Sequence, residues 1–292
     1  MMRYMILICC LIMAVTGCKK QESQITDANV IRVAASIYPL ADIIRNVGGD
    51  KVKVVTIMPP GASPHTFDVT PQTIRNITDI KAIFKIGHGI DDWADRVATS
   101  VSGNAKVIEV SNGIDLRKLP DGSVDPHYWL SMSNGAIIAE TIAKELAAIN
   151  PKDKDFFVAN LGKYKAQMLQ ADEEIKTKLG SLQNRSFATF HEAWFYFAQA
   201  YGLNVAAAFE PFPGKEPTPE YLADFITTIK ANKIKVIFSE PQFSSDALVQ
   251  VASDLQVKID TLDPEGGATE QTLTYIGMMK YNADKIYNAL SK

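Results

Sequence analysis

Residues 152–180 have the sequence KDKDFFVANLGKYKAQMLQADEEIKTKLG, which carries one continuous helical pattern. Apolar side chains recur in steps of three and four residues, the repeat that places them on one face of an α-helix. These apolar residues are Phe157, Leu161, Tyr164, Met168, Ala171, Ile175 and Leu179. No proline interrupts the segment, and Gly180 can end the helix. At about 1.5 Å per residue the helix would be roughly 40 Å long. We therefore predict a stiff spine helix that joins two lobes.

Both flanks of the spine alternate short apolar strands with helices. Before it we expect strands at residues 31–36, 52–58, 82–86 and 106–110, and helices at 40–47, 91–100 and 135–149. After it we expect strands at residues 187–190, 205–209, 236–239 and 257–262, and helices at 192–201, 221–232, 246–255 and 271–290. Thr70-Pro71 and Thr218-Pro219 each pair an N-cap residue with a proline suited to the first helical position. This alternation predicts an α/β fold with mostly parallel sheets covered on both faces.

The N-terminus has the pattern of a bacterial leader. Residues 5–15 form an apolar run shorter than the roughly 20 residues that a spanning helix needs. The run ends in VTGC at residues 15–18, which resembles a lipobox, so we expect cleavage before Cys18 and lipid on its thiol. An uncleaved anchor or an ordinary signal peptide is the alternative. The expected boundaries are 1–17 for the signal peptide, 18–29 for a polar tether, 30–150 for the first lobe, 151–181 for the spine and 182–292 for the second lobe.

Composition excludes some classes of partner. Hydrophobic residues make up 47% of the chain, charged residues 22%, and the formal net charge is −3, as in an ordinary globular protein. No block of Lys or Arg suggests a nucleic-acid surface. Cleavage would remove Cys9 and Cys10 and leave Cys18 as the only one of the three cysteines, so we expect no disulfide within the mature chain.

Four residues are candidate ligands for one metal ion: His65, His127, His191 and Asp263. His65 follows the expected strand 52–58, whereas His191 and Asp263 come directly after strands. Ligands of open α/β sheets bind outside the carboxyl ends of the strands. Three neutral imidazoles and one carboxylate can complete a tetrahedron around Zn²⁺. Because two candidates fall in each half of the chain, one ion held by all four would lie between the lobes.

Each candidate alone also has an ordinary structural explanation. A histidine can be a loop, interface or helix-capping residue, and an aspartate before proline is a common turn former. His88, between two glycines after another strand, is at most a residue near the site. Glu192 and Glu240 also lie at strand ends, where either could orient an imidazole N–H. Glu240 could equally belong to a plain turn before Pro241.

Enzyme motifs are missing from the sequence. It has no His-Glu-x-x-His helix, no glycine-rich phosphate loop and no Gly-x-Ser-x-Gly elbow. A catalytic zinc keeps one coordination position open for water, whereas a shell of three His and one Asp is closed. We therefore expect a protein that holds metal and is not an enzyme. A metal-dependent hydrolase of the cell surface and an adhesin or structural lipoprotein are the alternatives.

Several segments together resemble the metal-binding solute-binding proteins of bacterial ABC importers, the zinc and manganese uptake family. They are residues 34–40, 61–67 with Pro71, 125–130, 190–203, 216–218, 237–243 and 263–264. The similarity runs from about residue 30 to the end of the chain. It implies two Rossmann-like α/β lobes joined by one long helix, with the metal between them.

The resemblance also implies ligands at His65, His127, His191 and Asp263. Members with histidine at the third position look mostly like zinc binders, and manganese members more often have glutamate there, which suits a harder cation. His191 therefore favours Zn²⁺, with a manganese or iron carrier as the alternative. The chain lacks the long His-rich acidic loop of some zinc members.

The function so implied is capture and delivery without covalent chemistry. A monomer, anchored by lipid on Cys18 in the cell envelope outside the cytoplasm (the periplasm of a Gram-negative cell), would collect the ion. It would then dock on an ABC permease whose partner ATPase drives import. The spine helix would allow only a modest movement of the second lobe.

Overall fold

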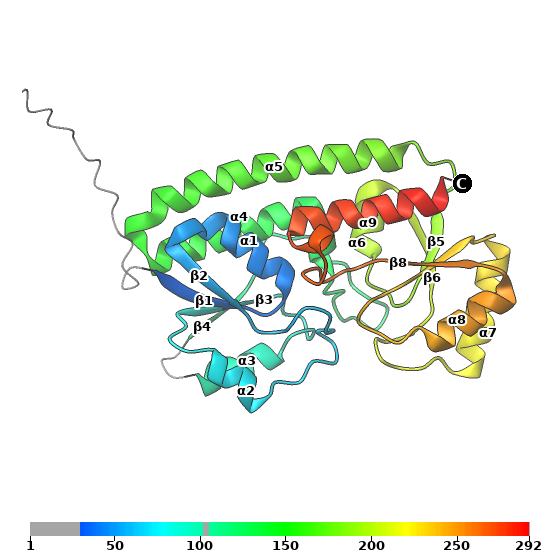
Figure 1. The fold of residues 1–292 in the computed structure, drawn as a ribbon, viewed down its shortest axis with the longest axis horizontal. Coiled ribbons are helices and arrows are strands. Elements are labelled where there is room, and N and C mark those ends of the chain that lie inside the picture. The colour runs from blue at the N-terminus through cyan, green and yellow to red at the C-terminus, as the bar shows by residue number, and fades with distance from the viewer. Residues whose placement is uncertain (1–29, 102–104, 292) are drawn as a thin grey trace, which may run out of the picture.

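The computed structural model describes residues 30–101 and 105–291. The expected signal peptide, the tether and Cys18 lie outside the described residues. Two four-stranded sheets form two lobes, with the strand orders β2-β1-β3-β4 and β6-β5-β7-β8 (Figure 1). Every pairing within them is parallel. The predicted α/β class with two parallel-sheet lobes is confirmed.

The first lobe contains β1 (Ile31–Ala35), α1 (Tyr38–Gly48), β2 (Val52–Thr56), α2 (Pro71–Asn76), β3 (Ala82–Lys85), α3 (Trp93–Ser100), β4 (Lys106–Glu109) and α4 (Met132–Ile149). The second contains β5 (Ser186–Thr189), α6 (Phe195–Tyr201), β6 (Asn204–Ala208), α7 (Pro219–Ala231), β7 (Val236–Ser239), α8 (Asp246–Leu255), β8 (Lys258–Thr261) and α9 (Tyr275–Leu290). The hydroxyl oxygens of Thr70 and Thr218 cap α2 and α7, because each accepts a bond from the backbone N–H three residues on. Both predicted caps are therefore confirmed.

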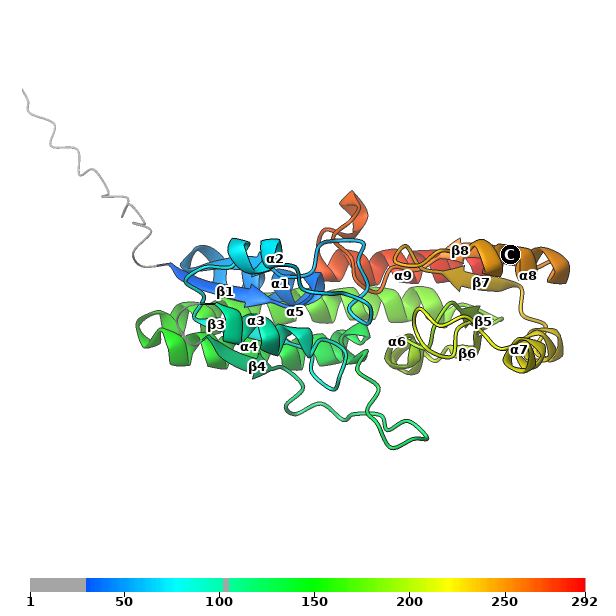
Figure 2. The same ribbon diagram turned by 90° about the horizontal axis from the view of Figure 1, so that it is seen from below.

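Helix α5 (Lys154–Gly180) is the predicted spine and runs along both lobes (Figures 1 and 2). It buries the predicted apolar stripe except Leu161, which is half-buried. The amide of Asn160 donates to the carbonyl of Val47 in α1, and the hydroxyl of Tyr201 in α6 donates to Asp172 on the spine. One rigid element is thus bonded to both lobes.

Helix α9 is a second link between the halves of the molecule. The hydroxyl of Tyr275, the first residue of α9, lies 2.7 Å from the carbonyl oxygen of Trp129 and 3.0 Å from that of Ser131. Its backbone N–H donates to Asp42 of α1 at 2.8 Å. Burial raises the pKa of Asp42, although the bonds from Tyr275 and Tyr164 oppose this. The start of the last helix is therefore fixed to the first lobe.

This contact predicts a cost for Gly135→Ala in α4. A Cβ at Gly135 would lie 2.6 Å from Cε1 of the buried Tyr275 ring. We expect the overpacking to lower the free energy of unfolding by about 1–3 kcal/mol, more than the roughly 1 kcal/mol that alanine contributes within a helix. Urea unfolding measures it. Gly162→Ala on α5 is the control, because among the described residues no atom outside its own stretch of helix lies within 4 Å of the added Cβ, and the helix should gain stability. A Gly135→Ala protein as stable as Gly162→Ala would contradict the close contact.

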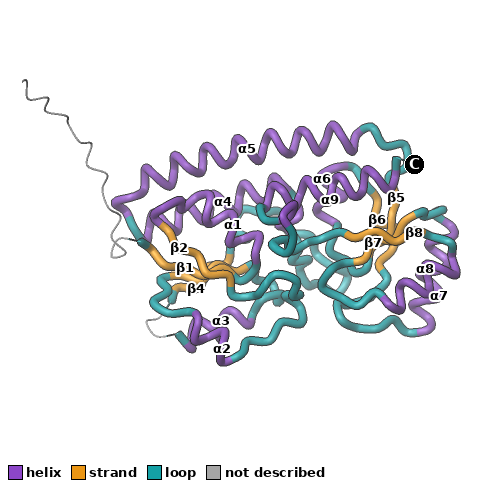
Figure 3. The backbone as a smooth tube through the Cα atoms, viewed as in Figure 1, coloured by secondary structure: helices purple, strands orange, loops and turns teal. Residues whose placement is uncertain are grey.

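Two predicted helices begin three or more residues later than expected. The helix predicted at 192–201 starts at Phe195, because residues 191–194 form a turn in which Ala193 N–H donates to the carbonyl of His191. The helix predicted at 271–290 starts at Tyr275, after a short 3-10 turn at Glu270–Thr272. Figure 3 shows loops from both lobes meeting between the sheets. Within residues 30–101 and 105–291, no helix combines the length and the hydrophobicity needed to cross a membrane.

Candidate metal centre

Three histidines from distant parts of the chain meet between the lobes. His65 lies in the loop after β2, His127 directly before the 3-10 turn Tyr128–Leu130, and His191 two residues after the end of β5. The Nε2 atom of His127 is 3.0 Å from Nε2 of His65 and 3.3 Å from Nε2 of His191. One ring nitrogen from each histidine lies within 4.8 Å of the other two. The fold therefore gathers three of the four residues proposed from the sequence.

The spacing of these nitrogens suits a tetrahedral ion. Zinc binds imidazole nitrogen at about 2.0–2.1 Å, so two ligands of a tetrahedron lie about 3.3 Å apart. The observed separations of 3.0 and 3.3 Å are close to that value. An ion among the three Nε2 atoms would need little rearrangement of these rings.

Asp125 fixes the orientation of His127. Its Oδ1 lies 2.9 Å from His127 Nδ1 and also accepts the backbone N–H of His127 at 3.1 Å. Burial acts to raise the pKa of Asp125, but the hydrogen bond from His127 and the charges of His127 and Arg117 outweigh it and hold the pKa below its ordinary value. An ionised carboxylate accepts a hydrogen bond from Nδ1–H, so Nε2 presents its lone pair to the cluster. This role of Asp125 was not predicted from the sequence, although the spacing Asp125-Pro126-His127 was a signal for it.

Glu240 lies beside His191 in a similar way. Its Oε2 is 2.7 Å from His191 Nδ1, without the alignment of a hydrogen bond, and its Oε1 accepts from the indole N–H of Trp194 at 3.3 Å. Both His191 and Glu240 are buried. Glu240 is therefore in a position from which its carboxylate could orient His191.

Burial keeps the imidazoles of the first lobe neutral. It lowers the pKa of His65 to about 2, with a further contribution from the neighbouring His127 and His191. Burial also lowers the pKa of His127, against the opposing effect of Asp125. A neutral imidazole is the form that binds a metal.

Asp263 lies outside the histidine cluster. The group of ligand atoms within 4.8 Å of one another does not include it. Its Oδ1 accepts from the side chain of Gln242 at 3.0 Å and from the backbone N–H groups of Glu265 and Gly266 at 3.1 and 2.9 Å. No described residue donates a hydrogen bond to Oδ2. The carboxylate is thus held in one orientation with one oxygen uncommitted.

Glu265, two residues beyond Asp263, is a buried carboxyl group that sequence reasoning did not single out. Burial raises its pKa well above the ordinary value, and the charges of Asp263, Glu240 and Asp91 act in the same direction. Among the described residues its Oε2 has no hydrogen-bond partner. Burial and the neighbouring carboxylates therefore both favour the neutral form of Glu265.

The other two candidates contact different partners. His88 Nε2 lies 3.2 Å from Glu109 Oε1, and the ring stands edge-on to Tyr128. Glu192 is 54% exposed and pairs with Arg117 Nη2 at 2.7 Å. Among the described residues, no hydrogen bond or ion pair joins Glu192 to an imidazole, so the prediction that it orients one directly does not match its position. The turn at residues 191–194 directs it to the surface.

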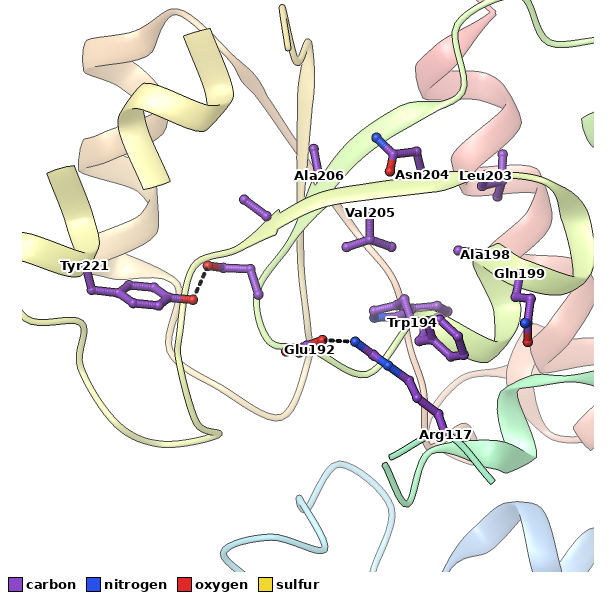
Figure 4. Close-up of a pocket in the computed structure, with 13 residues that line it drawn as sticks. Arg117, Glu192, Trp194, Ala198, Gln199, Leu203, Asn204, Val205, Ala206 and Tyr221 are labelled. Atoms are coloured by element: carbon purple, nitrogen blue, oxygen red, sulfur yellow. Dashed lines mark hydrogen bonds and ion pairs between the residues drawn. The ribbon is translucent and has the colours of Figure 1, made fainter. Parts of the chain in front are cut away.

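A cavity of about 520 Å³ opens beside the site (Figure 4). Arg117, Glu192, Trp194, Tyr221 and strand β6 line it, and the three histidines do not. The candidate metal centre is therefore a cluster of side chains that does not line this cavity.

Residues 33–289 match the model of a family described as "Zinc-uptake complex component A periplasmic". The chain is 30% identical, over 96% of each sequence, to the manganese ABC transporter substrate-binding lipoprotein PsaA of Streptococcus anginosus. A solved structure of a ZnuA deletion mutant with zinc bound has a TM-score of 0.81 and 31% identity, covering 90% of this chain and 99% of that one. The SBP FpvC of Pseudomonas aeruginosa in complex with Mn²⁺ has a TM-score of 0.80 and 29% identity, covering 90% and 98%.

Proposed function

Because the chain belongs to the family of zinc-uptake complex component A proteins, we propose that it captures Zn²⁺ outside the cytoplasm and delivers it to an ABC permease. The family consists of substrate-binding proteins and not of enzymes, and the chain is a metal-binding component of an ABC importer. The choice of zinc and the ligand set are the proposal.

The observation that best supports the proposal is that the Nε2 atoms of three imidazoles lie close together. Carboxylates lie against the Nδ1 atoms of His127 and His191, so both rings turn Nε2 toward the centre. Two lone pairs 3.3 Å apart in a buried site repel each other unless a proton or a cation lies between them. Burial disfavours the protonated form of His65 and His127. A metal ion satisfies all three nitrogens together.

We assign His65, His127 and His191 as the nitrogen ligands and Asp263 as the oxygen ligand. Oδ1 of Asp263 is already occupied by three donors, so Oδ2 is the atom offered to the ion. The resulting shell of three nitrogens and one oxygen is closed and leaves no position for a reactive water.

The nitrogen-rich donor set favours zinc over manganese. Imidazole suits Zn²⁺, whereas Mn²⁺ prefers carboxylate and water, and a given site binds Zn²⁺ more tightly than Mn²⁺. The similar PsaA and FpvC proteins are named or solved with manganese, which makes Mn²⁺ the second candidate. His191 is the position that we expect to decide between them.

Competition titration of metal-free protein tests the assignment. We expect Zn²⁺ to bind at least about tenfold more tightly than Mn²⁺. His191→Glu should narrow that preference, since it exchanges a nitrogen for a harder oxygen. Equal affinities in the unchanged protein, or manganese as the metal retained after growth in both metals, would reject zinc as the cargo.

We further propose that a lipid on Cys18 anchors the monomer in the cell envelope, facing away from the cytoplasm. This residue lies outside the part of the chain that the structure describes, and the VTGC motif at residues 15–18 supports the proposal. Mass spectrometry of the N-terminal peptide from membranes tests it, and an unmodified Cys18 would reject it.

A further inference from the structure

We propose that Arg117 and Glu192 form a latch between the lobes that slows release of the ion; this inference rests on the metal site proposed above. Arg117 comes from the segment between β4 and α4, which extends from the first lobe toward the second (Figure 2). Its Nη2 lies 2.7 Å from Oε1 of Glu192, an ion pair at the wall of the cavity in Figure 4. The guanidinium carbon also lies 4.1 Å from the centre of the Phe195 ring. The arginine of one lobe thus contacts the carboxylate and an aromatic ring of the other.

The other side of Arg117 reaches the metal centre. Its Nη1 lies 3.3 Å from Oδ2 of Asp125, the carboxylate that orients His127. The backbone N–H of Arg117 donates to the hydroxyl of Tyr196 at 2.9 Å, and that hydroxyl donates to the carbonyl of Asp125 at 3.1 Å. Arg117 is therefore a positioning residue held by both lobes.

The latch and the ion connect the same two segments. Asp125 precedes His127 by two residues, and Glu192 directly follows His191. Separating His127 from His191 must also separate Arg117 from Glu192, because neighbouring residues carry both contacts. While the ion pair persists, a ligand that lets go of the ion stays close enough to bind it again. Breaking the pair should therefore act mainly on the release rate.

The expected effect is moderate because the pair is partly open to solvent. The side chains of Arg117 and Glu192 are 25% and 54% exposed. Ion pairs of this kind make small contributions that added salt weakens, so we expect Glu192→Gln to release zinc about two- to fivefold faster. Arg117→Gln should have a larger effect, because it also leaves the buried Asp125 without its cationic partner.

Stopped-flow mixing of zinc-loaded protein with excess chelator measures the rate of zinc release, on which the latch is expected to act. The matched control is Glu140→Gln, which breaks an exposed ion pair between α4 and Lys165 of the spine without crossing between the lobes. We expect Glu140→Gln to release zinc at the rate of the unchanged protein. Because both substitutions break the same contact, the double variant Arg117→Gln/Glu192→Gln should accelerate zinc release by less than the product of the two single accelerations. Unfolding free energies of Glu192→Gln and Glu140→Gln should match.

Hydrogen exchange in the metal-free protein separates this inference from the metal assignment. We expect Glu192→Gln, but not Glu140→Gln, to exchange faster in peptides covering residues 113–131 and 190–201. Unchanged exchange there, or zinc release at the unchanged rate from Glu192→Gln, overturns the latch. If the unchanged protein binds no zinc, the proposed cargo is wrong, and the exchange experiment still decides whether the latch exists.

Discussion

His127→Ala is expected to lower the affinity for zinc by about a hundredfold or more. Zinc sites with four protein ligands contribute about 10–16 kcal/mol, so one ligand is worth about 3 kcal/mol. His127 is the central ring of the cluster, since the contacts of 3.0 and 3.3 Å both involve its Nε2. Competition with a chromophoric chelator measures the affinity.

The control for this experiment is His88→Ala, which removes a neighbouring histidine that lies against Glu109 outside the cluster. It should bind zinc as the unchanged protein does. Because His127→Ala leaves the buried Asp125 without its imidazole partner, urea unfolding of the metal-free variant must show that it remains folded. A folded His127→Ala protein with unchanged affinity would exclude the histidine cluster as the binding site.

Acid is expected to destabilise the metal-free protein by about 2 kcal/mol between pH 7.5 and pH 5 through His65 alone. Burial lowers the pKa of His65 to about 2 in the folded state, whereas an unfolded histidine titrates near 6.5. Below about pH 6.5 the unfolded chain therefore binds a proton that the folded chain does not. The stability present above pH 6.5 is lost progressively as the pH falls toward 2.

Urea unfolding at the two pH values measures this loss. His65→Gln is the matched variant, because it keeps a polar side chain and removes the titration. Between pH 7.5 and pH 5, the free energy of unfolding of His65→Gln should fall by about 2 kcal/mol less than that of the unchanged protein. Bound zinc should oppose the loss, since the ion stabilises only the folded state. Equal losses in both proteins would show that the pKa of His65 is not lowered in the folded protein.

Three structural links restrict how the lobes move. The spine α5 is bonded to α1 and α6, the start of α9 is fixed to the first lobe, and Trp129 donates its indole N–H to the carbonyl of Pro264 at 2.8 Å. The last contact joins a neighbour of His127 to the residue after Asp263. We therefore expect the lobes to separate only modestly when the ion is released.

Much of the fold followed from local sequence patterns. The stripe from Phe157 to Leu179 predicted α5 to within two residues, and strand 236–239 and helix 246–255 were predicted with their observed bounds. Thr70-Pro71 and Thr218-Pro219 marked two helix starts. These features are local, because periodicity and capping depend on residues a few positions apart.

The positions of the histidines after strands also followed from the sequence, but their partners did not. The ring nitrogens that meet belong to residues 62 and 64 positions apart. Arg117 and Glu192 are 75 positions apart, and no local pattern links them. Asp263 was grouped with the histidines, yet the structure holds it apart from them.

The sequence by itself determined the two α/β lobes, the spine and the residue types at the strand ends, because these depend on short-range periodicity and on the chemistry of each side chain. Only the tertiary structure decided which of those side chains meet, which carboxylate orients each imidazole and where Glu192 points. Those outcomes depend on how the two lobes pack along α5 and α9. Contacts between residues far apart in the sequence produce no periodic pattern from which they could be predicted.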